Sequence, residues 1–199
     1  TIQSTLTLGN DAQVLCTDNV LRKAFAPNFA DGTLSVIDLD TLTVAATVAV
    51  GQNPRRVACN AATHRVYVVH ATTPGSVTVV DASTHGVVTT IAVDNDSRNV
   101  AANFLIDEVF VSHFGSSTVS VVNTATNAVV ATLPVGTNPS APVSNDRLKK
   151  TYVASAADGT VTVIDQRTHA ISRTIKVGNA PQYAAVDGQH GKVYVNNVT

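Results

Sequence analysis

Hydrophobic and polar residues alternate along most of the chain in short runs. Residues 33–38 (TLSVID) and 76–81 (SVTVVD) are typical, because apolar side chains stand at alternate positions and an acid ends the run. Gly, Pro, Asn and Asp residues separate one run from the next. Runs of about 4–8 residues with this period are typical of β-strands and are too short for helices. The pattern therefore predicts an all-β chain of many short strands.

The runs recur at a fixed spacing. The alternating run appears, at steps of 42 or 43 residues, as TLSVID (33–38), SVTVVD (76–81), TVSVVN (118–123) and TVTVID (160–165). A second run follows each, as VAATVAVG (44–51), VVTTIAVD (87–94), VVATLPVG (129–136) and ISRTIKVG (171–178), with IQSTLTLG (2–9) as a fifth copy. A GxxP turn then appears as GQNP (51–54), GTNP (136–139) and GNAP (178–181).

Each repeat therefore contains four segments, which we label strands a to d. Strand a follows the GxxP turn, strand c is the alternating run, and strand d is the second run. Strand b carries an aromatic tetrapeptide, which reads FAPN (25–28), YVVH (67–70), FVSH (110–113), YVAS (152–155) and YVNN (194–197). Four strands in about 40–45 residues is the period of a β-propeller blade. We expect the aromatic column to pack between blades, and the varying fourth residue to lie at the surface.

In combination, these elements closely resemble the YVTN family of β-propeller repeats, over essentially the whole chain. The resemblance implies a cell-surface, surface-layer or periplasmic propeller, and hence a periplasmic, cell-surface or secreted location. It supplies no family-wide catalytic residues. A periplasmic relative that is associated with single-stranded DNA makes nucleic acid a further possible partner.

The repeat divides the chain into one propeller domain, 1–199. It comprises an outer strand with the first blade (1–51), a second (52–94), a third (95–136), a fourth (137–178) and a partial fifth blade (179–199). Two arrangements follow. The chain closes as a five-bladed ring, in which 2–8 pairs with 192–196, or it forms a section of a larger, for example seven-bladed, ring. An incomplete ring would expose apolar blade faces and favour self-association.

Composition and charge argue against several classes of function. The chain is 44% hydrophobic and 14% charged with a net charge of −1, which argues against disorder and against a general polyanion or membrane-surface binder. No apolar run is long enough to span a bilayer. The chain begins at Thr1 and has no methionine, so we expect a processed or excised chain. We expect Cys16 and Cys59, on neighbouring inner strands, to be buried thiols, with a disulfide as the alternative.

The candidate ligand site lies where the repeat is least regular. Because neighbouring strands are antiparallel, the d–a and b–c loops share one end of every blade. In the second and third blades that end carries Arg55, Arg56, His70, Arg98 and His113, and the turn there reads DNDS (94–97) in place of GxxP. Arginines and histidines of this kind suit a carboxylate or phosphate group. The alternative is a set of solvated loop residues in which Asp94 and Asp96 neutralise the arginines.

The other polar residues do not indicate a catalytic site. Asp38, Asp81, Asn123 and Asp165 end strand c in successive blades, where capping of the next turn explains them. The remaining histidines lie at hairpin turns and do not converge, so we expect no metal, no cofactor and no catalytic residues. We therefore expect a non-enzymatic binding or scaffold module of the cell envelope, with a small anionic ligand or a protein as partner. A lactonase- or lyase-like propeller enzyme is the alternative, and single-stranded nucleic-acid binding is a third.

Overall fold

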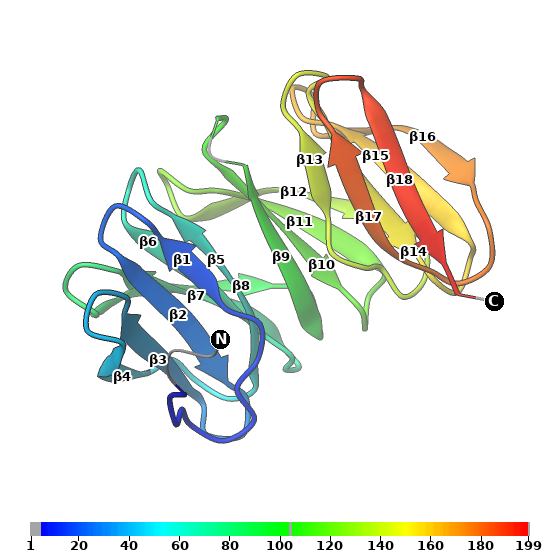
Figure 1. Cartoon of the computed structure of the whole chain (residues 1–199). Helices are drawn as coiled ribbons and strands as arrows, with labels where there is room; N and C mark the ends of the chain where they lie inside the picture. The colour runs from blue at the N-terminus through cyan, green and yellow to red at the C-terminus, as the bar shows by residue number, and fades with distance from the viewer. Residues whose placement is uncertain (1–4, 104, 199) are drawn as a thin grey trace. The chain divides into compact units, whose positions relative to one another are not determined.

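The computed structural model describes residues 5–103 and 105–198, and it contains the predicted series of four-stranded antiparallel sheets (Figure 1). Blade 1 comprises β1 (Cys16–Asp18), β2 (Lys23–Asn28), β3 (Thr33–Asp38) and β4 (Thr43–Ala49). Blade 2 comprises β5 (Pro54–Asn60), β6 (Arg65–His70), β7 (Gly75–Asp81) and β8 (Val87–Val93). Strands a to d of the sequence are thus neighbours in the same order within each sheet.

The later repeats follow the same order. Blade 3 comprises β9 (Ser97–Asn103), β10 (Glu108–His113), β11 (Thr118–Asn123) and β12 (Ala128–Pro134). Blade 4 comprises β13 (Val143–Asn145), β14 (Lys150–Ser155), β15 (Thr160–Asp165) and β16 (Ala170–Lys176). β17 (Pro181–Asp187) and β18 (Lys192–Asn197) form a two-stranded sheet, which we call the fifth sheet. The predicted fold class, including a partial last blade, is confirmed.

The chain divides into two compact units. The first, Thr1–Ala92, holds blade 1 and nearly all of blade 2. The second, Val93–Thr199, holds blade 3, blade 4 and the fifth sheet. Each unit has its own apolar core. The number of blades in a closed ring stays a prediction.

The cores lie between neighbouring sheets. In the first unit, Phe25 and Val36 of blade 1 pack with Val66 and Val68 of blade 2. In the second, Phe110 of blade 3 packs with Val153 and Ile164 of blade 4. The aromatic column of strand b is therefore buried as predicted, with at most 9% exposure in blades 1 to 4. It is 58% exposed at Tyr194 in the fifth sheet.

The turns after strand c are held by the side chain that ends the strand. Asp81 Oδ1 accepts hydrogen bonds from the backbone N–H groups of Ser83 (2.8 Å) and Thr84 (2.9 Å). Equivalent pairs of bonds are made by Asp38, Asn123 and Asp165. The predicted capping role is therefore confirmed, and these carboxylates belong to the architecture.

The prediction of an N-terminal strand over 2–8 is wrong for the residues that the structure describes. Residues 1–4 lie outside the described residues, and residues 5–8 do not form a strand. Leu6 and Leu8 instead pack against the small apolar cluster of Ala24, Ala26 and Ile37 in blade 1. This part of the segment is held by apolar burial and not by a strand ladder.

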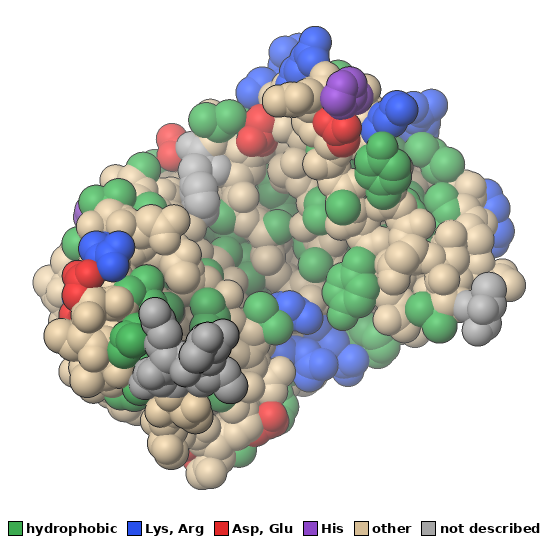
Figure 2. All heavy atoms as spheres, viewed as in Figure 1, with side chains coloured by type: hydrophobic (Ala, Val, Ile, Leu, Met, Phe, Trp, Pro, Cys, Tyr) green, Lys and Arg blue, Asp and Glu red, His purple; other side chains and the backbone are tan. Residues whose placement is uncertain are grey.

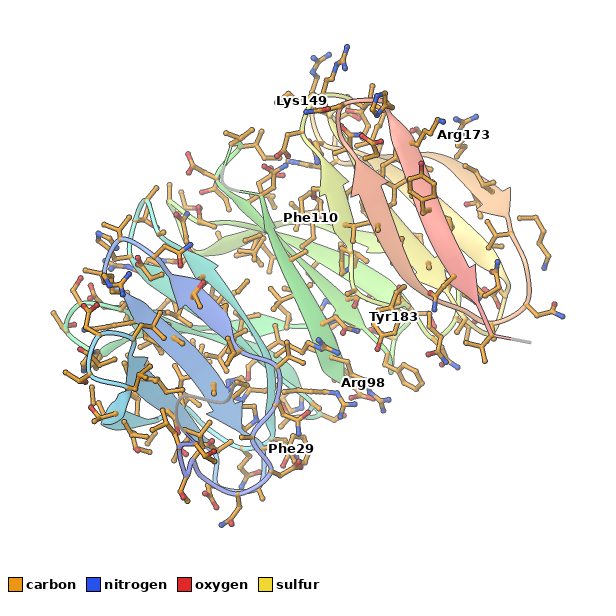
Figure 3. The ribbon with its side chains drawn as sticks, viewed as in Figure 1. Phe29, Arg98, Phe110, Lys149, Arg173 and Tyr183 are labelled. Carbon is orange, nitrogen blue, oxygen red and sulfur yellow. A yellow bond between two sulfur atoms is a disulfide. The ribbon has the colours of Figure 1, made fainter. Side chains whose placement is uncertain are left out.

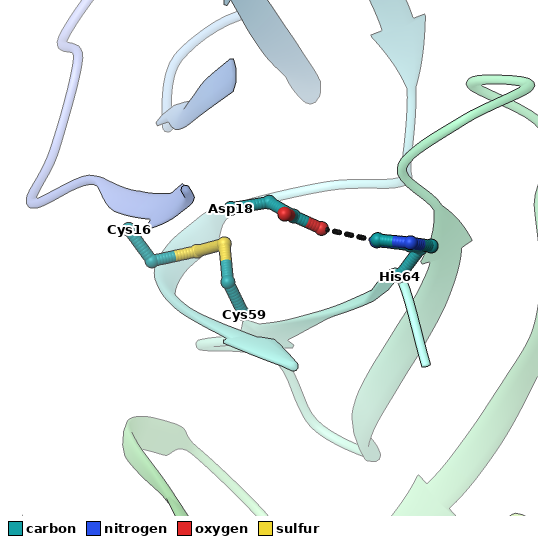
Figure 4. The surroundings of a disulfide bond; sticks show 4 residues. All are labelled: Cys16, Asp18, Cys59 and His64. Atoms are coloured by element: carbon teal, nitrogen blue, oxygen red, sulfur yellow. Dashed lines mark hydrogen bonds and ion pairs between the residues drawn. A yellow bond between two sulfur atoms is a disulfide. The ribbon is translucent and has the colours of Figure 1, made fainter. Parts of the chain in front are cut away.

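The expectation of two free thiols is wrong, because Cys16 and Cys59 form a disulfide between β1 and β5 (Figure 4). Their Cα atoms lie 5.7 Å apart, within the range that a disulfide spans. A second link lies beside it, since His64 Nδ1 is 2.7 Å from Oδ2 of the buried Asp18. The two blades approach more closely at this point than the sequence argument assumed.

We predict that removing this disulfide destabilises the first unit. The bridge closes a loop with a sequence separation of 43 residues, for which the loop-entropy relation gives a stabilisation of about 4 kcal/mol. Denaturant unfolding of the Cys16→Ala, Cys59→Ala double variant, compared with the oxidised chain, measures the loss. If the free energies of unfolding are equal, the bridge does not constrain the unfolded chain.

Candidate functional site

The fourth residue of the tetrapeptide is part of the core, which corrects the expected surface position. His70 is 2% exposed, and Asn28, His113 and Ser155 are fully buried. Each is the last residue of strand b and pairs with the residue that ends the preceding d–a turn, as His70 pairs with Pro54 and His113 with Ser97. Among the described copies, this residue is exposed only in the fifth sheet, where it is Asn197.

The buried side chain packs against the glycine that opens the same turn. A Cβ added at Gly136 would lie 2.6 Å from Cβ of Ser155, and one added at Gly9 would lie 2.6 Å from Cγ of Asn28. The same relation holds between Gly178 and Asn197. Close approach therefore requires the glycine in the GxxP turns at Gly136 and Gly178, whereas a Cβ at Gly51 would lie 3.5 Å from His70. Sequence periodicity alone did not reveal this packing.

We predict that Gly136→Ala destabilises the chain by about 1–3 kcal/mol, because the added methyl overpacks a filled site. Adding Ser155→Gly removes the opposing Cβ and restores part of the loss. Gly188→Ala is the matched control, since a Cβ there meets nothing within 4 Å. Thermal unfolding of the three variants measures the effect. Equal stability of the Gly136→Ala and Gly188→Ala variants would contradict this packing argument.

A β-bulge follows the same pair of residues and turns one side chain out of the ladder. Pro54 pairs with His70 and Arg56 with Val69, so Arg55 is the extra residue of strand a. Arg98 holds the equivalent position in blade 3, as does Gln182 in the fifth sheet. Bulges of this kind re-aim side chains and are frequent beside binding sites. Two of the five predicted site residues are thus bulge residues.

His70 fixes the turn behind Arg55. Its Nδ1 donates to the carbonyl oxygen of Gln52 at 2.8 Å, and its Nε2 lies 3.0 Å from Oγ1 of Thr78. The Thr78 hydroxyl also lies 3.0 Å from the carbonyl oxygen of Val50. Burial lowers the pKa of His70 and outweighs the opposing effect of the Gln52 carbonyl. His70 is therefore a neutral positioning residue and makes no direct ligand contact in this structure.

His113 has the same role in blade 3. The Ser97 hydroxyl donates to the carbonyl oxygen of Asp94, so His113 Nδ1 donates to Ser97 Oγ at 2.9 Å. Nε2 then accepts from the Ser120 hydroxyl at 2.8 Å. Burial lowers the pKa of His113 to about 4, against a smaller raising effect of Asp94. At neutral pH both predicted histidines are uncharged.

We predict that His113 makes the chain acid-sensitive. Between its ordinary pKa of 6.5 and about 4, the imidazole is protonated in the unfolded chain and neutral in the folded one. Above pH 6.5 the neutral imidazole makes its full contribution to the free energy of unfolding. This contribution is lost as the pH falls toward 4, by about 3 kcal/mol in total.

The test is urea unfolding at several pH values. Asn occupies the equivalent position in blade 1 and the fifth sheet, so His113→Asn is a suitable variant. Its stability should fall less steeply over this window than that of the unmodified chain. Identical pH dependence of the His113→Asn variant and the unmodified chain would refute the assignment.

The three predicted arginines differ in their partners. Arg98 forms an ion pair with Asp96, with Nη2 2.7 Å from Oδ2, and its Cζ lies 3.6 Å from the ring centroid of Phe114. Arg98 is labelled in Figure 3. Arg55 and Arg56 are half-buried on β5, and neither has a carboxylate within ion-pair distance among the residues that the structure describes. Asp96 thus neutralises one arginine, while Asp94 accepts a hydrogen bond from Thr118.

The structure places the predicted residues in two sets. In the first unit, the Pro54–His70 pair brings Arg55 and Arg56 beside His70. In the second, the Ser97–His113 pair brings Arg98 beside His113. The sequence reasoning missed the histidine links between blades, Asp18 with His64 and Glu108 with His169. The sequence contains a signal for both links, because each histidine lies at a turn position opposite an acidic residue of the preceding blade.

Two further properties bear on the site. Within residues 5–103 and 105–198, no group of three or more His, Cys, Asp or Glu side chains is arranged to hold a metal ion. The described part of the chain also contains no helix that is long and apolar enough to cross a membrane.

Comparison with solved structures identifies the fold. The chain is similar to hydrazine synthase of Kuenenia stuttgartiensis (TM-score 0.75, 18% identity, covering 92% of this chain and 54% of that one). It is also similar to the Cps50 (Swd1) β-propeller domain of Myceliophteria thermophila (TM-score 0.79, 15% identity, 98% and 65%). A functionally unknown protein from Desulfotomaculum acetoxidans gives a TM-score of 0.83 at 16% identity, with 96% and 64% covered.

These similarities establish a β-propeller fold and, at such low identity, nothing finer. The chain spans between about half and two thirds of the length of these three structures. No protein-family model matches the chain, and no curated protein matches it. The resemblance to YVTN repeats therefore rests on the repeat motifs alone.

Proposed function

We propose that the chain is a non-enzymatic binding module of the cell envelope that takes a carboxylate or phosphate group through Arg55 and Arg56. One observation carries this proposal. Arg55 and Arg56 are both half-buried residues of β5, and neither has a carboxylate within ion-pair distance among the described residues. A partly desolvated cation without an acid favours an anionic partner, because charge-assisted hydrogen bonds strengthen as water is excluded.

The surroundings of the two arginines favour a fixed site. Arg55 projects from a bulge whose flanking residue, Pro54, is paired with the buried His70. His70 is hydrogen-bonded to the turn carbonyl of Gln52, which ties the d–a turn to strand b. The backbone that carries the arginines is therefore held before a ligand arrives, which reduces the entropy lost on binding.

The chemistry of the histidines supports binding without catalysis. In both His70 and His113 each ring nitrogen has a hydrogen-bond partner inside the protein. Burial lowers the pKa of both rings, and for His113 it does so to about 4, which is below the range near neutrality that suits a general base. Recruiting either ring for proton transfer would disrupt the core.

The disulfide supports a location in the cell envelope. Disulfides persist in oxidising compartments such as the periplasm and the cell surface, and they are rare in the cytosol. The Cys16–Cys59 bridge connects two blades and so contributes to the tertiary structure. The repeat motifs resemble those of surface and periplasmic propellers, which is consistent with the same location.

The test uses inorganic phosphate and citrate as probes in calorimetric titrations. We predict that Arg55→Gln combined with Arg56→Gln weakens binding by at least about tenfold, as expected for the loss of charge-assisted hydrogen bonds. Arg98→Gln is the matched control, because Arg98 occupies the equivalent bulge but is already paired with Asp96. It should change the affinity by less than about twofold.

Two results would contradict the proposal. One is equal affinity of the double variant and the unmodified chain. The other is tight binding of single-stranded DNA with a steep salt dependence that the arginine variants reduce, which would favour the nucleic-acid alternative.

A further inference from the structure

The contact between blades 3 and 4 contains a buried carboxylate of which only one oxygen is paired. Glu108 begins β10, and its side chain is 8% exposed. Its Oε1 atom lies 2.5 Å from Nε2 of His169, a turn residue of blade 4. The other oxygen, Oε2, is buried and has no hydrogen-bond partner among the residues that the structure describes. A buried polar atom of this kind is costly, so it indicates that a further group binds beside it.

Two buried amide side chains also leave one atom each without a partner. Asn103 is 2% exposed and Gln166 is 4% exposed. Oδ1 of Asn103 accepts from the backbone N–H of Leu105 at 3.1 Å, whereas its Nδ2 has no partner in the described part of the chain. Nε2 of Gln166 donates to the carbonyl oxygen of Lys150 at 3.2 Å and to Oγ1 of Thr151 at 3.1 Å. Within the same described residues, Oε1 of Gln166 accepts no hydrogen bond.

Strand register places Asn103 and Glu108 on the face of blade 3 that contacts blade 4. The two residues are directly opposite each other in the β9–β10 ladder, so their side chains share one face of the sheet. Phe110 lies two residues further along β10 and therefore on the same face. It packs against Ile164 of blade 4.

Gln166 lies on the facing surface of blade 4. Thr151 is opposite Ile164 in the β14–β15 ladder and shares its face, and the Gln166 side chain is hydrogen-bonded to Thr151. Gln166 and His169 belong to the same turn, and the contact of His169 with Glu108 brings this turn to blade 3. The three unpartnered atoms, Asn103 Nδ2, Glu108 Oε2 and Gln166 Oε1, thus converge at one end of the contact between the blades.

The equivalent place between blades 1 and 2 is filled by a lysine. Lys23 and Ala82 hold the repeat positions of Glu108 and Gln166, and Lys23 Nζ donates to the carbonyl oxygen of Ala82 at 3.3 Å. The same Nζ lies 2.8 Å from Nε2 of His85, which is the equivalent of His169. A donor of several hydrogen bonds thus occupies this place in the first unit. In the second unit a carboxylate oxygen and an amide oxygen lie there, and both require a donor.

We propose that one water molecule binds between blades 3 and 4, where it donates to Glu108 Oε2 and Gln166 Oε1 and accepts from Asn103 Nδ2. Water has two hydrogens to donate and can accept as well, so it matches two acceptors and one donor. Buried waters typically make about three hydrogen bonds to groups that otherwise lack partners. A metal ion matches less well, because the hydrogens on Asn103 Nδ2 would face it. The site does not involve Arg55 or Arg56, so the inference is independent of the proposed ligand.

The charged groups around the site leave the carboxylate in need of this hydrogen bond. Burial raises the pKa of Glu108, and the hydrogen bond and charge of His169 oppose that effect. Lys150, whose carbonyl group binds Gln166, has its Nζ 2.5 Å from Asp165. Other Lys and Arg side chains of the second unit lie on the surface in Figure 2. A hydrogen bond donated by water favours the charged form of a carboxylate.

A crystal structure of the full chain tests the position of the water. We predict one water with contacts of about 2.7–3.2 Å to Asn103 Nδ2, Glu108 Oε2 and Gln166 Oε1. In solution, the bound water should give a cross-relaxation peak with the side-chain amide protons of Asn103. A rotating-frame NMR experiment separates this peak from proton exchange, because the two effects have opposite signs.

A double variant tests whether these side chains bind the water. Glu108→Lys combined with Gln166→Ala introduces the residues that blades 1 and 2 have at this place. We predict that the water peak of Asn103 is lost, because the new ammonium group donates directly to the carbonyl oxygen of residue 166 and to His169. Gln189→Ala is the control at an exposed turn residue of the fifth sheet, and it should keep the peak.

Three results would overturn the inference. The first is a crystal structure in which the three side chains bond directly to one another with no water between them. The second is a bound atom at about 2.3–2.6 Å from the two oxygens, which is the distance of a calcium ion. The third is an unchanged water peak in the double variant. The measurements on the unmodified chain decide the matter if the double variant does not fold.

Discussion

Apolar packing between neighbouring sheets is the interaction on which the rest of this structure depends. Each blade is apolar on both faces, so it is stable only where another sheet covers it. Phe25 and Phe110 are fully buried at such interfaces, and burying one large apolar side chain contributes about 1.5–3 kcal/mol. The aromatic position of strand b is therefore kept in every repeat. The disulfide and the His64–Asp18 pair add specific links to a contact that apolar burial already provides.

A second level of organisation joins the turns to the blades. The last residue of strand b is buried against the turn glycine, and the bulge beside it directs the side chain that follows. Variation among Asn, His and Ser at the buried position changes the hydrogen bonds that hold the turn. Variation between Arg and Gln at the bulge changes the charge of the side chain that leaves the strand ladder there. The same small unit thus provides both a buried core position and a variable side chain at the bulge.

The fold could be predicted from the sequence because every repeat contains the same local pattern of short strands and turns. Strand order, the aromatic column and the capping role of Asp81 all follow from alternation and turn chemistry within one repeat. The features that were missed depend on distances between segments. The approach of Cys16 to Cys59 and the burial of His70 are set by how sheets and turns pack, which periodicity does not contain. Arg98 and Arg55 hold equivalent positions in the repeat, and the ion pair with Asp96 and the contact with the Phe114 ring distinguish Arg98.

The central claim, that covering both faces stabilises a blade, is tested most directly by native-state hydrogen exchange. Tyr152 and Tyr194 are equivalent residues of β14 and β18, but their exposures are 9% and 58%. The account predicts that amides of Val153 and its neighbours in β14 exchange at least a hundredfold more slowly than the equivalent amides of β18. Equal protection of the two strands would show that coverage of the blade faces does not control stability.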